Sequence, residues 1–483
     1  MPSPGSLAPA ATGNLRPNRT ELTLLILFAG LALVLLLLDA ANFVRIEFVV
    51  GAGLLGLIFC RRNLQLYLSF TLWLWFITPF VRRILNYRTG WVDTDPILGA
   101  SLLATCACLP QVYRHLSRGD ARRGLPFLLG FGAVGYGCIA GMFETPFQSL
   151  LLEAAGWIGP MIFGFYVFLE YAEEPNREGM AAAFESTFRW GLLIMGGYGI
   201  LQLILMPAWD ALWITQVNNP AFGTAEPFGL RVFSTMASPV PFGVASFAGL
   251  ILLRGQRGGT SVLATFGGYA SLAFSSVRST WGLWLIATIL VVVLQRQKLG
   301  RFLLIIGISL SLLVLSSMAF EPVRGVLQKR FETLSDLRND GSLLDRTSGY
   351  EQMKSYVLSN PLGVGLAATV NLVGGRSDLG GRDSGVLEIV LSLGWIGGGL
   401  YFAALLLIVW RGLNGRDGLS EFEISACAIS IAMVSHMILS TISLGFDAVM
   451  LWSFAGVSLA SQRHRVVKRE AGPLLSGGQL SKA

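Results

Sequence analysis

Long runs of apolar residues, separated by short polar connections, dominate the chain. A run of roughly 17 to 25 such residues can cross the hydrocarbon core of a bilayer as an α-helix. This criterion predicts membrane-spanning helices at 21–39, 43–60, 64–80, 96–113, 124–142, 148–171, 188–206, 238–254, 260–276, 280–295, 301–319, 385–410, 421–441 and 444–460. We therefore expect an all-α polytopic membrane protein with about fourteen transmembrane helices.

Composition agrees with this pattern. Apolar residues make up 53% of the chain and charged residues 13%, about half the charged share of a water-soluble domain. The net charge of +7 could indicate a nucleic-acid partner, but the basic residues are spread over many short connections, so we expect no nucleic acid. The five cysteines lie in or beside apolar runs, which argues against a disulfide framework or a Cys-ligated metal. We expect no cofactor.

The basic residues also predict an orientation. Cytoplasmic connections between membrane helices are enriched in Lys and Arg, and here every second connection is basic if the N-terminus lies inside. The basic connections contain Arg61 and Arg62, then Arg114, Arg118, Arg122 and Arg123, then Arg254 and Arg257, then Arg296, Lys298 and Arg301, then Arg411 and Arg416. Only 172–187 is weakly basic. We expect a bacterial inner-membrane protein with both termini in the cytoplasm.

The long connection 320–384 stands out among the short ones. It contains VRGVLQKRFETLSDL and RTSGYEQMKSYVLSN, which have the apolar spacing of short amphipathic helices. The predicted organisation is a disordered cytoplasmic tail 1–20, helices one to eleven in 21–319, a partly helical periplasmic loop 320–384, helices twelve to fourteen in 385–460 and a cytoplasmic tail 461–483. Long structured loops are more often functional than not, so we expect the function to face outward.

Arginines on the predicted outer face are the main candidates for ligand contacts. They are Arg82, Arg83, Arg231, Arg278, Arg346 and Arg382. A guanidinium can bind a phosphate group through two parallel hydrogen bonds. Arginines at the membrane surface could therefore bind a lipid-linked diphosphate. The alternatives are solvated loop charges, pairs with loop acids or, for Arg82 and Arg83, anchors at the membrane interface. Arg278, in FSSVRSTWGLW, lies in a very short connection, where an ionisable residue tends to face the bundle interior.

Two carboxylates and one histidine complete the candidate site. Asp383 and Glu388 follow the long loop, and either could be a general base for an acceptor hydroxyl. Glu388 could instead stabilise the start of a helix. His436 lies in the outer part of the span 421–441, where it contacts substrate or makes a structural hydrogen bond inside the bundle. The sequence contains no nucleotide-binding or metal-binding motif, which argues against an ATP-driven pump or a metalloenzyme.

Several of these segments, in this order, resemble the superfamily of O-antigen ligases and Wzy-type polysaccharide polymerases. They are SSVRSTWGLWL, DRTSGYEQMKSYVLSNPLGVG and the Gly-rich run before GVLEIVLSLGWIGGGLYF, within about residues 230 to 410. ITPFVRRILNYRTGW is similar to exopolysaccharide polymerases of the superfamily. Ligases of the superfamily carry a His just after the Gly-rich run, where this chain has Asp383 and Ser384. That departure favours a polymerase.

The resemblance implies a GT-C-like fold and a metal-independent glycosyltransferase that lengthens undecaprenyl-diphosphate-linked oligosaccharide into exopolysaccharide or O-antigen. Arg278, Asp383 and Glu388 would then be catalytic, and Arg82, Arg83, Arg231, Arg346, Arg382 and His436 would bind substrate. Membrane lipid, a chain-length regulator and a flippase are further candidate partners. Two alternatives remain open: a ligase that transfers finished glycan to an acceptor, and a secondary transporter or flippase.

Overall fold

The computed structural model describes residues 17–117, 124–143, 145–295, 307, 357–367, 384–414 and 418–476, with side chains up to 462. All regular secondary structure in these ranges is helical. Several predicted features lie outside the described residues. These are the span 301–319, most of the loop 320–384 with its two amphipathic segments, and the candidate site residues Arg346, Arg382 and Asp383.

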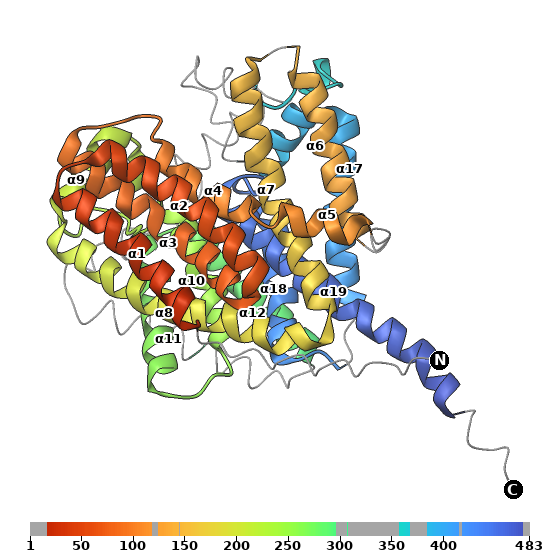
Figure 1. Cartoon of the computed structure of the whole chain (residues 1–483). Helices are drawn as coiled ribbons and strands as arrows, with labels where there is room; N and C mark the ends of the chain where they lie inside the picture. The colour runs from red at the N-terminus through yellow and green to blue at the C-terminus, as the bar shows by residue number, and fades with distance from the viewer. Residues whose placement is uncertain are drawn as a thin grey trace, which may run out of the picture.

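Helices occupy the predicted spans of the first half of the chain (Figure 1). They are α1 (Arg19–Leu37), α2 (Ala41–Arg62), α3 (Leu64–Thr89), α4 (Gly99–Cys106), α5 (Leu109–Ser117), α6 (Leu125–Gly141) and α7 (Phe147–Ala172). Two differences from the sequence prediction stand out. Helix α3 continues nine residues past the predicted end at 80, and the span predicted at 96–113 is broken between α4 and α5.

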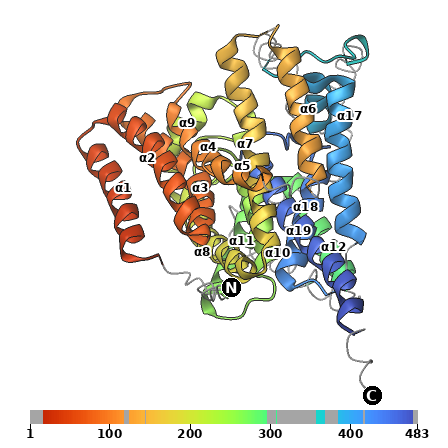
Figure 2. The ribbon, with the colours of Figure 1, turned by 45° about the vertical axis from the view of Figure 1, so that its right-hand side comes forward.

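The second half follows the predicted spans as closely. Its helices are α8 (Arg177–Leu205), α9 (Ala208–Val217), α10 (Pro239–Leu253), α11 (Gly259–Ser275), α12 (Arg278–Gln295), α17 (Gly385–Asn414), α18 (Glu421–His436) and α19 (Gly445–Ser476). Short 3-10 turns lie at Pro96–Leu98, Glu174–Asn176 and Pro220–Phe222. Figure 2 shows α6, α7 and α17 standing beside one another, apart from the group formed by α1, α2 and α3.

Eight helices of the described part are long and apolar enough to cross a membrane, with the broken α4–α5 segment counted as one. Two shorter apolar helices, α6 and α10, add to them. Helix α1 packs little against the other helices: only 6% of its most apolar stretch is buried. This exposure is expected for a helix whose surface is covered by lipid. The chain is therefore a multi-pass helical membrane protein.

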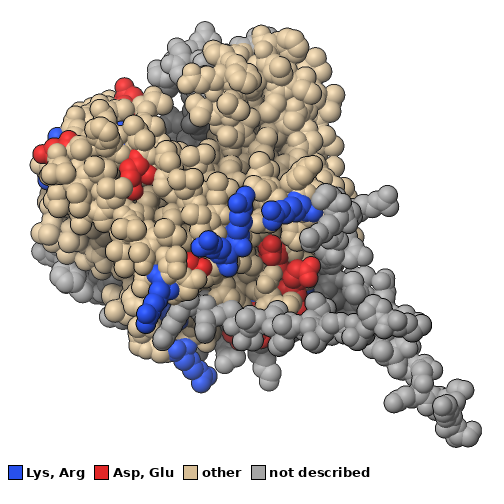
Figure 3. Space-filling model, in the orientation of Figure 1, with Lys and Arg blue, Asp and Glu red and all other residues tan. Residues whose placement is uncertain are grey.

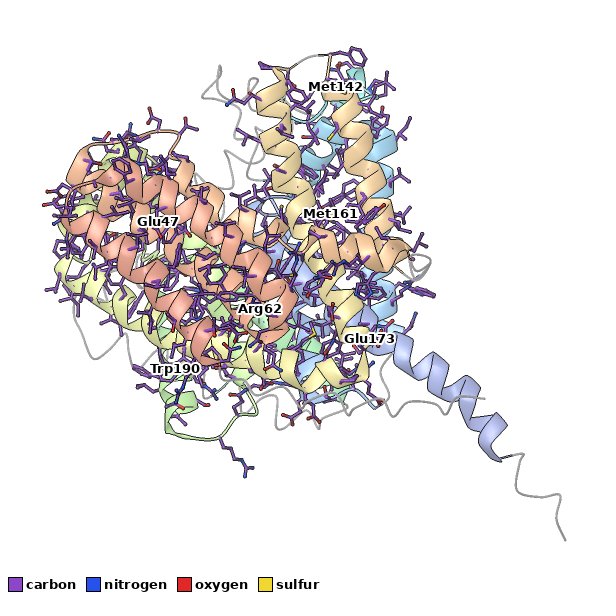
Figure 4. The ribbon with its side chains drawn as sticks, in the orientation of Figure 1. Glu47, Arg62, Met142, Met161, Glu173 and Trp190 are labelled. Atoms are coloured by element: carbon purple, nitrogen blue, oxygen red, sulfur yellow. The ribbon has the colours of Figure 1, made fainter. Side chains whose placement is uncertain are left out.

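The connections between helices lie at two opposite ends of the bundle. We call them the upper end and the lower end, as in Figure 4, where Met142 of the α6–α7 connection lies at the top and Arg62 and Glu173 lie low. In the view of Figure 3, many of the visible Lys, Arg, Asp and Glu side chains lie toward the lower half, whereas the projecting α6–α7 end shows none.

The centre of the bundle is formed by α7 and α19, which pack along each other. Phe127 of α6 and Trp452 of α19 lie 5.4 Å apart, ring centre to ring centre, and Phe127 lies 5.2 Å from Phe165 of α7. A methyl group added to Gly164 of α7 would overlap the backbone of Trp452. Small residues at helix crossings permit this close approach in membrane proteins.

Helix α17 reverses direction at Gly394, so it is two helices rather than one straight span. Gly394 has φ 64° and ψ −167°, a conformation open essentially to glycine alone. A methyl group on Gly398 would lie 3.7 Å from the Cα atom of Val390, whereas a straight helix separates residues eight apart by about 12 Å. The second arm, 395–414, descends to the lower end, where Gly412 contacts Cys427 of α18.

The segment 357–367 closes the top of this hairpin. Near the turn, Trp395 donates its backbone N–H to the carbonyl oxygen of Pro361 (2.8 Å), and Val364 donates to that of Leu391 (2.8 Å). On the other side, the hydroxyl of Tyr136 in α6 donates to the carbonyl oxygen of Leu362 (3.0 Å). Irregular backbone in a membrane protein requires such partners, because lipid offers none. The NPLGVG stretch of the sequence thus has a definite structural role.

Candidate functional site

Polar side chains gather where α12, α17, α18 and α19 meet at the upper end. The group, which we call the upper polar cluster, consists of Arg278, Ser279, Glu388, His436, Thr441, Ser443 and Asp447. Each comes from a helix end or from the connection 437–444, so the cluster lies beyond the apolar middle of the helices. It consists of two sets of contacts at the connection between α18 and α19: His436 with Ser279 and Asp447, and Glu388 with Thr441 and Ser443.

His436 is the centre of the cluster. Its ring is 1% exposed and lies between a hydroxyl and a carboxylate: Nε2 is 3.3 Å from Oγ of Ser279, and Nδ1 is 3.8 Å from Oδ2 of Asp447. A carboxylate beside one ring nitrogen favours the tautomer that carries its hydrogen there, which leaves the other nitrogen able to accept a proton. The ring therefore presents Nε2 to the hydroxyl of Ser279.

Glu388 is held by the connection between α18 and α19. Its carboxylate is buried (5% exposed for the residue), and Oε2 accepts hydrogen bonds from the hydroxyls of Thr441 and Ser443, the latter at 2.9 Å. The first turn of α17 is tied to the same connection, because the backbone N–H of Gly385 donates to Ser440 (3.1 Å).

Arg278 is the first residue of α12 and is partly buried. The preceding turn is tight, since Ser276 has φ 53°, and the segment after Leu230 runs beside it: the backbone N–H of Val232 donates to the carbonyl oxygen of Phe274 (3.0 Å). This bond brings the segment that carries Arg231, itself half-buried, next to the turn that precedes Arg278. Two of the predicted arginines therefore belong to neighbouring segments.

Arg83 has a partner within the protein. It forms an ion pair with Asp210 (2.9 Å), and both side chains are fully buried. The guanidinium also donates to the carbonyl oxygen of Ser234 and lies 4.7 Å from the ring centre of Phe233. Asp210 in turn accepts from Tyr198 (2.7 Å) and from Gln202 (2.9 Å). This buried network fixes the segment around Ser234, and a substrate contact by Arg83 remains a prediction.

Arg82 lies in a different environment. One of its terminal nitrogens donates to the carbonyl oxygens of Val92 (2.8 Å) and Asp93 (2.7 Å). The guanidinium carbon is 5.4 Å from the ring centre of Trp91 and 5.0 Å from that of Trp213. Arginine binds aromatic faces in this way through the ring quadrupole. These contacts hold the connection 90–95 against α9, and substrate binding by Arg82 likewise remains a prediction.

Sequence reasoning missed three residues that the structure brings into play. Asp447 and Ser279 flank His436, and Asp210 pairs with Arg83. Asp447 could have been noticed as a carboxylate at the very start of an apolar run. The pairings themselves join segments far apart in the sequence, which no local pattern predicts. Among the described residues, no group of three or more His, Cys, Asp or Glu side chains is placed to hold a metal ion.

Comparison of the chain with models of known protein families gives no match, and comparison with curated proteins gives none either.

Proposed function

We propose that this protein is a membrane glycosyltransferase that polymerises undecaprenyl-diphosphate-linked oligosaccharide repeat units at the outer face of the bacterial inner membrane. One observation carries the proposal: at the upper end of the bundle, His436 lies between the hydroxyl of Ser279, the neighbour of Arg278 in the chain, and the carboxylate of Asp447. An arginine beside a histidine and a carboxylate has the groups that glycosyl transfer from a diphosphate requires. The resemblance of the sequence to polysaccharide polymerases supports the same reaction.

In the proposed reaction, a hydroxyl of one lipid-linked repeat unit attacks the anomeric carbon of another. The new glycosidic C–O bond forms as the bond from that carbon to the diphosphate breaks, and undecaprenyl diphosphate leaves with the bonding electron pair. The hydroxyl proton passes to a base of the protein. Arg278 would stabilise the charge that develops on the leaving diphosphate, through two parallel hydrogen bonds. Confinement of both substrates to one membrane plane would supply proximity.

The geometry favours His436 over Glu388 as the base. Oε2 of Glu388 already accepts hydrogen bonds from the hydroxyls of Thr441 and Ser443, so an acceptor hydroxyl would have to displace one of them. His436 faces a hydroxyl, that of Ser279, through Nε2 and a carboxylate, that of Asp447, through Nδ1. An acceptor hydroxyl that replaced Ser279 at Nε2 would lose its proton to the ring, and Asp447 would stabilise the resulting imidazolium. Glu388 would then position the connection 437–444, and Asp383 stays a candidate outside the described residues.

The proposal includes an orientation. The lower-end connections contain Arg61, Arg62, Arg177, Arg254 and Arg257, and an excess of basic residues marks the cytoplasmic side of a membrane protein. The upper polar cluster would then face the periplasm, where flipped lipid-linked repeat units are available. About fourteen spans, both termini in the cytoplasm and a periplasmic loop at 320–384 complete the proposed topology.

The test is reconstitution. Purified protein in liposomes, given single-repeat undecaprenyl-diphosphate donor without nucleotide or added metal, should produce a ladder of lengthened products. His436→Gln should slow chain extension about 10²- to 10⁴-fold, which is the usual contribution of a general base. Arg278→Lys should also slow it, because lysine keeps the positive charge but cannot make the two parallel hydrogen bonds of a guanidinium. His115→Gln, at the lower end, is the matched control and should extend chains normally.

The alternatives predict different results in the same liposomes. A flippase would move the donor across the bilayer without lengthening it. A ligase would transfer glycan only when a separate acceptor is added. No ladder from the wild-type protein, together with either of these activities, would refute the polymerase proposal. A ladder that His436→Gln leaves unchanged would refute the assignment of the base alone.

A further inference from the structure

A pocket of about 340 Å³ lies at the lower end, between α10, α11, α12 and α18. Its polar lining includes Arg254, Arg257 and Glu421, and its apolar lining includes Ile251, Trp284 and Val291. The volume is within the range of pockets that hold small ligands, about 300 to 1,000 Å³. The pocket is far from the upper polar cluster, so it is independent of the proposed glycosyl transfer.

Two positive charges and one negative charge line the pocket, and the negative charge of Glu421 acts on Arg254. Arg254 caps the end of α10 and is partly buried; its terminal nitrogen donates to the backbone carbonyl of Glu421 at 3.4 Å. Burial lowers the pKa of Arg254 to about 10, so the side chain remains charged at neutral pH. Arg257 is exposed at the mouth of the pocket. Both guanidinium groups can therefore take an anion.

One negative charge lies opposite them. Glu421 is the first residue of α18, but the cap of that helix is made by other groups: the Ser420 hydroxyl accepts from the backbone N–H of Glu423 (3.2 Å), and the Glu423 carboxylate accepts from that of Ser420 (2.8 Å). The Glu421 carboxylate is not part of this cap. Its side chain is exposed and lines the pocket beside Arg254.

The loop between α10 and α11 is held in place. Gln256 donates to the carboxylate of Glu185 in α8 (2.7 Å) and accepts from Arg189 (3.3 Å). Because Gln256 lies between Arg254 and Arg257 in the chain, these bonds hold the loop that carries both arginines. A preformed arrangement of charges binds its ligand at a lower entropic cost than a loose one.

We propose that this pocket binds a glycerophospholipid with a phosphate and a primary ammonium group, as in phosphatidylethanolamine. The phosphate lies between Arg254 and Arg257, the ammonium contacts Glu421, and an acyl chain follows Ile251, Trp284 and Val291. Two positive charges and one negative charge match this headgroup. A lipid with phosphate alone leaves Glu421 unpaired beside an anion, and the methylated ammonium of a choline lipid has no N–H to donate. Basic pockets between membrane helices are known sites for lipid headgroups.

Native mass spectrometry of the purified, delipidated full chain tests the proposal. Ethanolamine, glycerol and choline phospholipids with the same acyl chains are added in turn to the detergent-solubilised protein. The ethanolamine lipid should bind most tightly. Arg254→Gln should weaken its binding about ten- to a hundredfold, as expected for loss of a charge-assisted hydrogen bond, and Arg257→Gln should weaken it less because that side chain is exposed.

Glu421→Gln distinguishes headgroup recognition from simple attraction of phosphate. It should reverse the preference, so that the glycerol lipid binds at least as tightly as the ethanolamine lipid. Arg114→Gln, at the lower end but outside the pocket, is the matched control and should bind like the wild type. Equal binding of the three lipids by the wild type, or unchanged binding after Arg254→Gln, would overturn the proposal. Displacement of the lipid by soluble phosphoethanolamine would also overturn it, since the ligand would then be a free headgroup.

Discussion

Asp210→Asn tests how much the buried ion pair with Arg83 contributes to the fold. The charges are 2.9 Å apart at their nearest atoms and fully buried. With charge centres about 4 Å apart and an effective dielectric constant of about 20, their attraction is about 4 kcal/mol. Removal of one partner also leaves the other charge buried and unpaired, and such changes cost about 3–5 kcal/mol. We expect a loss of this size in the free energy of unfolding.

The chain provides a matched control on the same helix. Arg88 pairs with Asp39 at 3.2 Å, but the two side chains are 37% and 73% exposed. An exposed pair contributes at most about 1 kcal/mol, so Asp39→Asn should change stability little. Unfolding by sodium dodecyl sulfate in mixed micelles, followed by circular dichroism and tryptophan fluorescence, measures both variants against the wild type.

A second variant keeps the test informative if Asp210→Asn fails to fold. In the double variant Arg83→Leu with Asp210→Leu no unpaired charge is left, so part of the stability should return, although Tyr198 and Gln202 lose their acceptor. Equal losses from Asp210→Asn and Asp39→Asn would refute the reasoning, because they would show that burial does not increase the cost of breaking the pair.

Two further predictions concern the hairpin and the topology. Gly394→Ala should cost about 1–3 kcal/mol because alanine is strained at the observed φ and ψ; Gly399→Ala, where a methyl group would meet no atom within 4 Å, should be neutral or stabilising in the same unfolding assay. Reporter proteins inserted at Met142 and at Glu173 should be active on opposite sides of the membrane, periplasmic at Met142; a cytoplasmic signal there would reverse the proposed orientation.

Hydropathy predicted the helices well because the requirement for an apolar surface is local to each segment. Most of the described helices lie at the predicted spans, including the short pair α11 and α12, whereas α9 lies between two predicted spans and was not predicted. The run 385–410 shows the limit of this reasoning. It is continuously apolar, and nothing in the pattern distinguishes a straight span from a reversal at Gly394, because both arms are buried in an apolar environment. The reversal depends on the backbone conformation of Gly394. Hydrogen bonds from the segment 357–367 stabilise that conformation.

The site was predictable residue by residue but not as an arrangement. Arg278, Glu388 and His436 were all noticed as ionisable residues in or near apolar runs, and the structure places each of them in the first or last turn of its helix. Their immediate partners, Ser279, Thr441 and Asp447, were not, since short polar residues at helix ends are common. Arg83 was predicted to follow the end of a span at 80, but it is buried inside α3, which continues to Thr89, and its pairing with Asp210 depends on how α9 packs, which hydropathy does not specify.

The reversal in α17 also sets how deep a functional group can sit. A straight helix of this length would extend about 45 Å, well beyond a hydrocarbon core of about 30 Å, and would carry its first turn out into water. Because the helix folds back at Gly394, residue 388 lies about 9 Å below residue 394 along the first arm. Glu388 therefore lies level with the ends of α18 and α19, at a depth that a lipid-anchored headgroup can reach without leaving the bilayer.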